Sequence, residues 1–177
     1  MKLGLEKNEV RIVPYDPEWK DEFSKVKKEI QSLVGIDENR IQHIGSTAID
    51  GICAKPIIDI LLGLDDVNEM DKAFERKLRT IGFYRLRVKR PNEVVFAKFA
   101  DETFSVKTHF IHVVTFNEEL WTNLIFFRDY LNENGPAKNE YMNIKNEYLR
   151  QNVSTDVNEY TDFKEQFVQG IFAKRLN

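Results

Sequence analysis

Cysteine and long apolar runs are nearly absent from this 177-residue chain. The one cysteine, Cys53, excludes a disulfide framework within the chain, and we expect it to have a packing role. The sequence contains no run of about 20 apolar residues, which a membrane-spanning helix would need. The first ten residues, MKLGLEKNEV, contain no apolar signal segment. We therefore expect a cytoplasmic protein with no membrane contact.

The chain also lacks an excess of positive charge. It has 26 Lys and Arg residues and 29 Asp and Glu residues, which give a formal net charge of −3. That balance provides no general electrostatic footprint for nucleic acid, so we do not expect nucleic acid as a partner. A local basic run, Arg85, Arg87, Lys89 and Arg90, could act alone but is expected to be a solvated strand end and loop. The 42% hydrophobic content is sufficient for one buried core.

The periodicity of apolar residues predicts an α/β (α+β) fold with C-terminal helices. We expect one domain, with an α/β core over about residues 1–116 and a helical appendage over about 117–177. The sequence predicts helices from Pro17 to Leu33, over Val67–Thr80, from Glu118 to before Gly135, from Pro136 to Leu149 and from Asn158 to Lys174. The last two should bury Tyr141, Ile144 and Tyr148, and Phe163, Phe167 and Ile171. Strands are predicted before Gly45 and over Ile57–Leu64, Phe83–Val88, Val94–Phe99 and Phe104–Thr115, the last two as a hairpin.

The most informative segment runs from Arg40 to Leu64, RIQHIGSTAIDGICAKPIIDILLGL. Gly45 allows a sharp turn and the close approach of a ligand. Ser46 and Thr47 add hydroxyl and backbone donors that suit a phosphate, and Lys55 adds a positive charge. Asp59 lies in an otherwise apolar strand, where an ionised carboxylate is costly unless it is paired. We therefore expect the turn and Lys55 to hold a phosphate, and Asp59 to meet either a metal ion or a hydrogen-bonding partner.

This segment resembles the signature of the GrpB family of small bacterial proteins. The likeness extends over nearly the whole chain, through VRIVPYDPEWKDEF (Val10–Phe23), THFIHVV (Thr108–Val114), LIFFRDYLNEN (Leu124–Asn134) and YTDFKEQFV (Tyr160–Val168). The family is in turn similar to the nucleotidyltransferase superfamily of the DNA polymerase beta type. In that superfamily a Gly-Ser turn precedes two acids separated by one residue. The resemblance implies a nucleotidyltransferase-like mixed sheet flanked by helices.

The chain departs from that superfamily pattern at the second acid, where Leu61 stands two residues after Asp59. Two carboxylates at that spacing would face the same way and share a pair of divalent ions. The strand that could supply a third acid offers His109 and His112 instead. These two lie three residues apart and so face opposite sides of a strand, and the resemblance favours His112 as the residue that faces the site.

Three further positions have both a functional and a structural interpretation. His43 either faces the site or is a satisfied polar residue beneath the turn. Arg128 could reach a phosphate or simply pair with Asp129. Tyr160 and Lys164 share one helix face and could close over a nucleotide, or could border a packed face.

Three functions remain open on the sequence. The chain could transfer a nucleotidyl group from a nucleoside triphosphate to an unknown acceptor, with Asp59 and His112 catalytic and with Gly45, Ser46, Thr47, Lys55 and His43 holding the nucleotide. Asp59 would then bind Mg²⁺ or Mn²⁺. It could be an inactive module that binds a nucleotide or another phosphorylated small molecule. It could also be a transition-metal hydrolase built on His43, Asp59 and His112.

Overall fold

The computed structural model describes residues 2–6, 9, 11–151 and 157–175, without the side chains of residues 149, 151 and 157–163. Within them, a six-stranded sheet has the order β2-β3-β6-β5-β4, and β1 pairs with β6. The pairing of β3 with β6 is parallel and the other pairings are antiparallel, so the sheet is mixed. The strands are β1 (Leu5–Glu6), β2 (Ile41–Ile44), β3 (Ile58–Leu64), β4 (Phe83–Arg85), β5 (Glu93–Phe99) and β6 (Val106–Thr115). The helices are α1 (Glu18–Val34), α2 (Lys72–Thr80), α3 (Glu119–Glu133), α4 (Gly135–Gln151) and α5 (Val157–Lys174).

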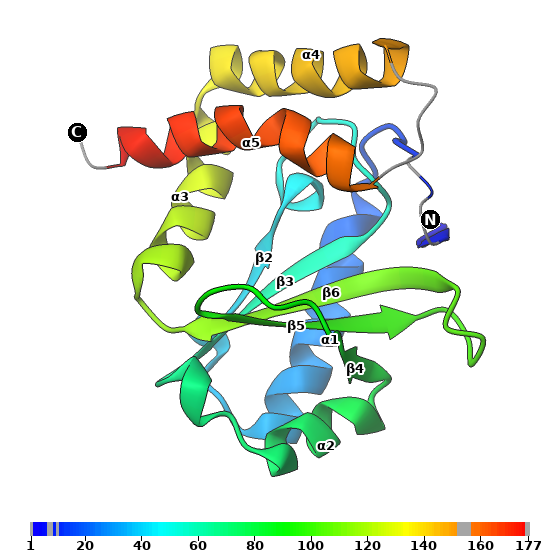
Figure 1. The fold of residues 1–177 in the computed structure, drawn as a ribbon, viewed down its shortest axis with the longest axis vertical. Helices are drawn as coiled ribbons and strands as arrows, with labels where there is room; N and C mark the ends of the chain where they lie inside the picture. Colours follow the sequence, from blue (N-terminus) through cyan, green and yellow to red (C-terminus); the bar gives the residue numbers. More distant parts are fainter. Residues whose placement is uncertain (1, 7–8, 10, 152–156, 176–177) are drawn as a thin grey trace.

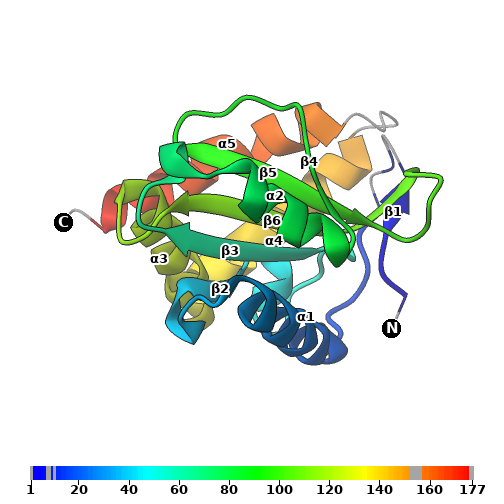
Figure 2. The ribbon, with the colours of Figure 1, turned by 90° about the horizontal axis from the view of Figure 1, so that it is seen from below.

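Helices α1 and α2 cover one face of the sheet (Figures 1 and 2). The largest group of buried apolar residues lies between these helices and the strands, and it includes Trp19 and Ile30 of α1, Leu78 of α2 and Ile58, Ile60 and Leu62 of β3. Because side chains alternate along a strand, Asp59 and Leu61 face the other way. Asp59 therefore lies on the face of the sheet opposite α1.

Helices α3, α4 and α5 lie beyond the opposite face and toward one end of the sheet (Figure 1). Leu61 packs there with Trp121 of α3. The connection between β2 and β3 contributes Ile49 and Ile52 to a second apolar cluster, whose helical members include Phe127, Leu131, Tyr141 and Ile171. These contacts fix the segment after the Gly-Ser turn beneath the C-terminal helices.

Most predicted elements are present, but the helix predicted over Val67–Thr80 is wrong in its first part. Val67–Glu69 forms a separate 3-10 turn, and α2 begins at Lys72. The side chain of Asp71 accepts a hydrogen bond from the backbone N–H of Phe74 at 2.7 Å, which is the geometry of a helix N-cap. The cap at Asp71 therefore marks the start of α2, whereas the periodicity of apolar residues predicted one continuous helix from Val67.

Two smaller differences concern the chain's polar residues. Strand β4 ends at Arg85, so the basic residues Arg87, Lys89 and Arg90 lie in the connection to β5. In α4, Tyr141 and Tyr148 are buried as predicted, whereas Ile144 is half-buried and Lys145 is fully buried. The predicted burial of Phe163 lies outside the described side chains. No helix among the described residues has the length and apolar character to cross a bilayer.

Candidate functional site

Gly45 forms the turn that brings β2 against Asp59. Its φ of 70° lies in the region that favours glycine, and it leads directly into the 3-10 turn Ser46–Ala48. The antiparallel register of β2 and β3 places Ile44 opposite Asp59. A Cβ atom at residue 45 would overlap the Asp59 carboxylate, with Asp59 Cβ only 3.1 Å away. The expected neighbourhood of the Gly-Ser turn and Asp59 is therefore present.

His43 and Thr47 lie beneath this turn. His43 pairs with Ile60 rather than with Asp59, so it faces α1, where its ring stacks on Phe23 with centroids 4.8 Å apart. Its Nε2 is 2.9 Å from Thr47 Oγ1, and both side chains are buried. Burial lowers the pKa of His43 to about 4, which leaves the ring neutral at pH 7. Of the two interpretations of His43, the structure therefore supports the satisfied polar residue beneath the turn, because the sheet separates His43 from Asp59 and His112.

Lys145 of α4 reaches the turn from the helical side. Its ammonium donates hydrogen bonds to Ser46 Oγ at 2.8 Å and to the Cys53 carbonyl at 3.0 Å. The ammonium also lies 4.2 Å from the centre of the Tyr141 ring, and the Tyr141 hydroxyl is 3.3 Å from Ser46 Oγ. Lys145 is fully buried, and burial lowers its pKa to about 7, with the charge of Lys164 contributing.

Two more lysines complete what we call the lysine cluster, Lys55, Lys145 and Lys164. Burial lowers the pKa of Lys55 to about 8 against the opposing charge of Asp59. Burial, followed by the charge of Lys55, lowers the pKa of Lys164 to about 7, again against Asp59. The three lysines come from the β2–β3 connection, α4 and α5, and their charges are linked, because Lys164 acts on Lys145, Lys55 acts on Lys164, and Asp59 acts on Lys55 and Lys164. The two interpretations of the pair Tyr160 and Lys164 are not decided, because the side chain of Tyr160 lies outside the described part.

On the other side of Asp59, His112 lies between two carboxylates. Its Nε2 is 3.5 Å from Asp59 Oδ1, and its Nδ1 is 2.5 Å from Glu93 Oε1. Burial acts to lower the pKa of His112, but the hydrogen bonds and charges of Asp59 and Glu93 outweigh it and raise the pKa to about 9. The ring is thus an imidazolium at pH 7, with each N–H facing a carboxylate.

This arrangement does not fit a resident metal ion. Among the residues that the structure describes, no three His, Cys, Asp or Glu side chains converge as ligands. Leu61, in the second acid position, is fully buried and offers no ligand atom. A divalent ion that arrives with a triphosphate needs few protein ligands, because magnesium keeps water and phosphate oxygens around it. Asp59 is the one carboxylate of the signature strand that could contact such an ion.

Sequence reasoning missed Lys145, Tyr141 and Glu93 as members of the site. Lys145 had a signal, because it stands four residues after Tyr141 and three before Tyr148, inside the predicted buried stripe. Glu93 had none, since its role depends on β5 lying beside β6. Arg128 pairs with Asp129 at 2.7 Å and also donates to the His43 carbonyl at 3.0 Å, so it ties α3 to β2.

The close approach of Gly45 to Asp59 can be tested against Gly51, a second glycine with a positive φ. We expect Gly45→Ala to lower the free energy of unfolding by about 1–3 kcal/mol more than Gly51→Ala, measured by urea denaturation. Both residues have positive φ, but a Cβ at Gly51 would meet nothing within 4 Å. Equal losses in the two variants would show that only backbone strain matters and that the contact with Asp59 does not.

The buried charge of Lys145 should make stability depend on pH. The unfolded lysine has a pKa near 10.5 and the folded one near 7, so between these values the unfolded chain binds the extra proton. The cost of burial is therefore complete below pH 7 and shrinks as the pH rises, with a slope approaching about 1.4 kcal/mol per pH unit for one proton. Unfolding measured at pH 6, 7.5 and 9 should show Lys145→Met gaining most over the wild type at pH 6. A constant difference, like that expected for Lys138→Met on the same helix, would contradict this prediction.

Comparisons with known proteins agree with this architecture. The family model described as GrpB protein matches residues 9–174. The glutamate-rich protein GrpB of Alkalihalophilus pseudofirmus is 41% identical over 170 residues, covering 96% of this chain and 97% of its own.

Two solved structures extend the comparison to the fold. The conserved protein GrpB from Enterococcus faecalis has a TM-score of 0.75 at 21% identity, covering 94% of this chain and 100% of its own. The Cid1 poly(U) polymerase has a TM-score of 0.54 at 16% identity, covering 78% of this chain and 44% of its own. The mixed sheet and its helices are thus nucleotidyltransferase-like, and the chain belongs to the GrpB family.

Proposed function

We propose that the chain binds a nucleoside triphosphate at Ser46 and the lysine cluster and transfers its nucleotidyl group to an acceptor hydroxyl. The observation that carries this proposal is the environment of Lys145. Its ammonium is fully buried, and within the described part of the chain its hydrogen bonds go to uncharged oxygens. A buried cation without a carboxylate partner is costly, and a phosphate group would supply the missing charge.

The lysine cluster also matches the charge of a triphosphate. Burial lowers the pKa of Lys55, Lys145 and Lys164, and the charge of a neighbouring lysine lowers the pKa of Lys145 and Lys164 further. Binding of a polyanion would raise those values again, so it would take up protons. Ser46 would contribute its hydroxyl, which already lies between Lys145 and Tyr141. Among the fold neighbours, Cid1 structures are described as bound to Mg 3'-dATP and to MgGTP, which supports a nucleotide as the ligand class.

The two sides of Asp59 would then have different roles. Transfer in line requires the acceptor and the leaving pyrophosphate to lie on opposite sides of the α-phosphorus. The lysine cluster lies on the β2 side of Asp59 and would hold the leaving pyrophosphate. His112 and Glu93 lie on the β6 and β5 side, where the acceptor oxygen would bond to phosphorus. The bond between the α-phosphorus and the pyrophosphate oxygen breaks, and the hydroxyl proton passes to water. A divalent ion bound to the triphosphate would contact Asp59.

A second candidate is a nucleotide-binding module that does not catalyse transfer. Leu61 favours it, because a fully buried leucine takes the place of the second acid of the superfamily pattern. The triphosphate contacts would be the same in both cases. Pyrophosphate release distinguishes them.

Binding is tested by calorimetric titration of ATP, UTP and GTP with Mg²⁺ into the wild type, Ser46→Ala and Lys145→Met. Each variant should lower the affinity for whichever of these nucleotides the wild type binds by about 5- to 150-fold, because a hydrogen bond to a charged phosphate is lost. Lys138→Met is the matched control, since Lys138 of α4 contacts the Asp50 carbonyl instead. Unchanged affinity in Lys145→Met would refute the site.

Catalysis is tested by pyrophosphate release from the bound nucleotide in the presence of candidate acceptors. We expect Asp59→Asn to abolish release and to change triphosphate affinity by less than about tenfold, because the lysine cluster remains and each 1.4 kcal/mol is tenfold. Release that continues in Asp59→Asn would remove Asp59 from the mechanism. Binding without release in the wild type, whatever the acceptor, would establish the non-catalytic module.

A further inference from the structure

The charge of this chain is distributed very unevenly. Residues 72–90 contain eight Lys and Arg residues and one acid, although the whole chain has a net charge of −3. The structure brings these residues to one end of the sheet. Three of them, Lys72, Arg76 and Arg79, are spaced by four and three residues and so share one face of α2. Concentrated positive charge on a chain of opposite net sign indicates a dedicated anion-binding surface.

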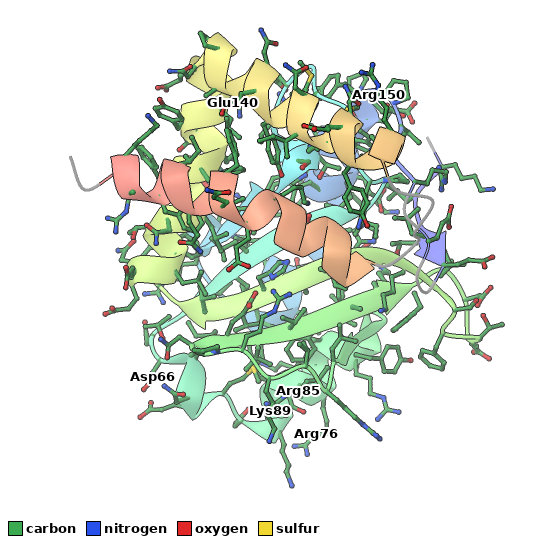
Figure 3. The ribbon with its side chains drawn as sticks, turned by 45° about the horizontal axis from the view of Figure 1, so that its top comes forward. Asp66, Arg76, Arg85, Lys89, Glu140 and Arg150 are labelled. Atoms are coloured by element: carbon green, nitrogen blue, oxygen red, sulfur yellow. The ribbon has the colours of Figure 1, made fainter. Side chains whose placement is uncertain are left out.

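A groove lies between α2 and β4 on this surface. It has a volume of about 410 Å³ and is lined by four cations, Lys72, Arg76, Arg79 and Arg85, by Glu75 and by the aromatic residues Phe83, Tyr84 and Phe96. Glu75, its one acid, is already paired with Arg85. Figure 3 shows Arg76, Arg85 and Lys89 gathered in the same region, below the sheet in that view. We call these cations, together with Arg87 and Arg90 of the β4–β5 connection, the basic surface.

Aromatic side chains adjoin the basic surface. The Arg79 guanidinium lies 5.4 Å from the centre of the Tyr84 ring. Tyr84 in turn contacts Phe104 edge to face, with ring centroids 4.9 Å apart, and Phe104 is 48% exposed. Exposed aromatic rings beside cations favour nucleic acid as the partner, because its bases stack on rings while its phosphates pair with Lys and Arg.

The β4–β5 connection brings part of the basic surface to the face of the sheet that carries the candidate site. The β4–β5 connection stands on the face of the sheet opposite α1, which is the face of Asp59 (Figures 1 and 2). Arg90 of this connection pairs with Glu93 at 3.2 Å, and Glu93 and His112 then lead to Asp59. Strand β4 is three strand spacings from β3, about 14 Å, which is a distance that two or three nucleotides span.

We infer that the basic surface binds single-stranded nucleic acid, with phosphates on its Lys and Arg side chains, bases on Tyr84 and Phe104, and the terminal hydroxyl directed toward Asp59. Its role as the acceptor rests on the proposed function, because the hydroxyl would then receive the nucleotidyl group. Binding itself does not depend on that reaction. The terminal hydroxyl would reach Asp59 from the β5 side, which is opposite the lysine cluster. In-line transfer requires this arrangement.

The test is fluorescence anisotropy with a labelled single-stranded RNA of 15 nucleotides, without nucleoside triphosphate, over a range of salt concentrations. The variant combines Arg87→Ala and Lys89→Ala, two exposed residues of the β4–β5 connection. The control combines Lys25→Ala and Lys28→Ala, two exposed residues of α1 with the same loss of charge. Loss of two phosphate contacts should reduce the slope of log affinity against log salt by about 1.4. The control should keep the wild-type slope and affinity.

Each other outcome would overturn the inference. No RNA binding by the wild type at low salt would do so directly. Equal weakening in the variant and the control would mean that net charge alone attracts the RNA. Displacement of the RNA by polyglutamate at equal charge concentration would identify an acidic peptide surface instead. Because no triphosphate is present, these failures leave nucleotide binding by the lysine cluster untouched, and loss of nucleotide binding alone would overturn only the proposed function.

Discussion

The contact between the backbone of residue 45 and the Asp59 carboxylate is the constraint on which the rest of the site depends. No Cβ atom fits there, and the positive φ of Gly45 directs the chain away from β2 immediately after the contact. Ser46 is consequently held beside Asp59 while Ile49 and Ile52 continue into the cluster beneath α3 to α5. One glycine thereby joins the sheet, which provides Asp59, to the connection and helices that provide the three lysines.

The helical part concentrates positive charge where packing alone would favour apolar residues. Lys145 occupies a position that a leucine or methionine would fill at lower cost, and its pKa falls toward neutrality as a result. The aromatic and aliphatic contacts of α3, α4 and α5 with the β2–β3 connection offset that cost. A buried cation lowers the stability of the fold, and destabilising charged groups of this kind are typical of binding sites for anionic ligands.

On the β6 side of Asp59, a histidine pairs with the carboxylate. The chain thus departs from the superfamily pattern of two acids on one strand without leaving Asp59 unpaired. Asp59, His112 and Glu93 come from β3, β6 and β5, which are neighbours in the sheet, and their side chains share one face. The imidazolium of His112 satisfies both acids, and Arg90 extends the alternation of charge to the β4–β5 connection. The strand that lacks its second acid is therefore electrostatically balanced by a cationic side chain of the protein.

The sequence by itself determined the features that depend on local periodicity. The Gly-Ser turn between two strands, the opposite faces of His109 and His112, and the helices of the C-terminal part all follow from spacings of two, three and four residues. The tertiary structure decided which elements are neighbours. It placed His43 behind the sheet, brought Lys145 to Ser46 and the charge of Lys164 toward Asp59 from separate helices, and made Glu93 the partner of His112. Periodicity specifies which side of an element a residue faces, but the partner on that side depends on packing between segments far apart in the chain, and a single sequence carries no local signal for it.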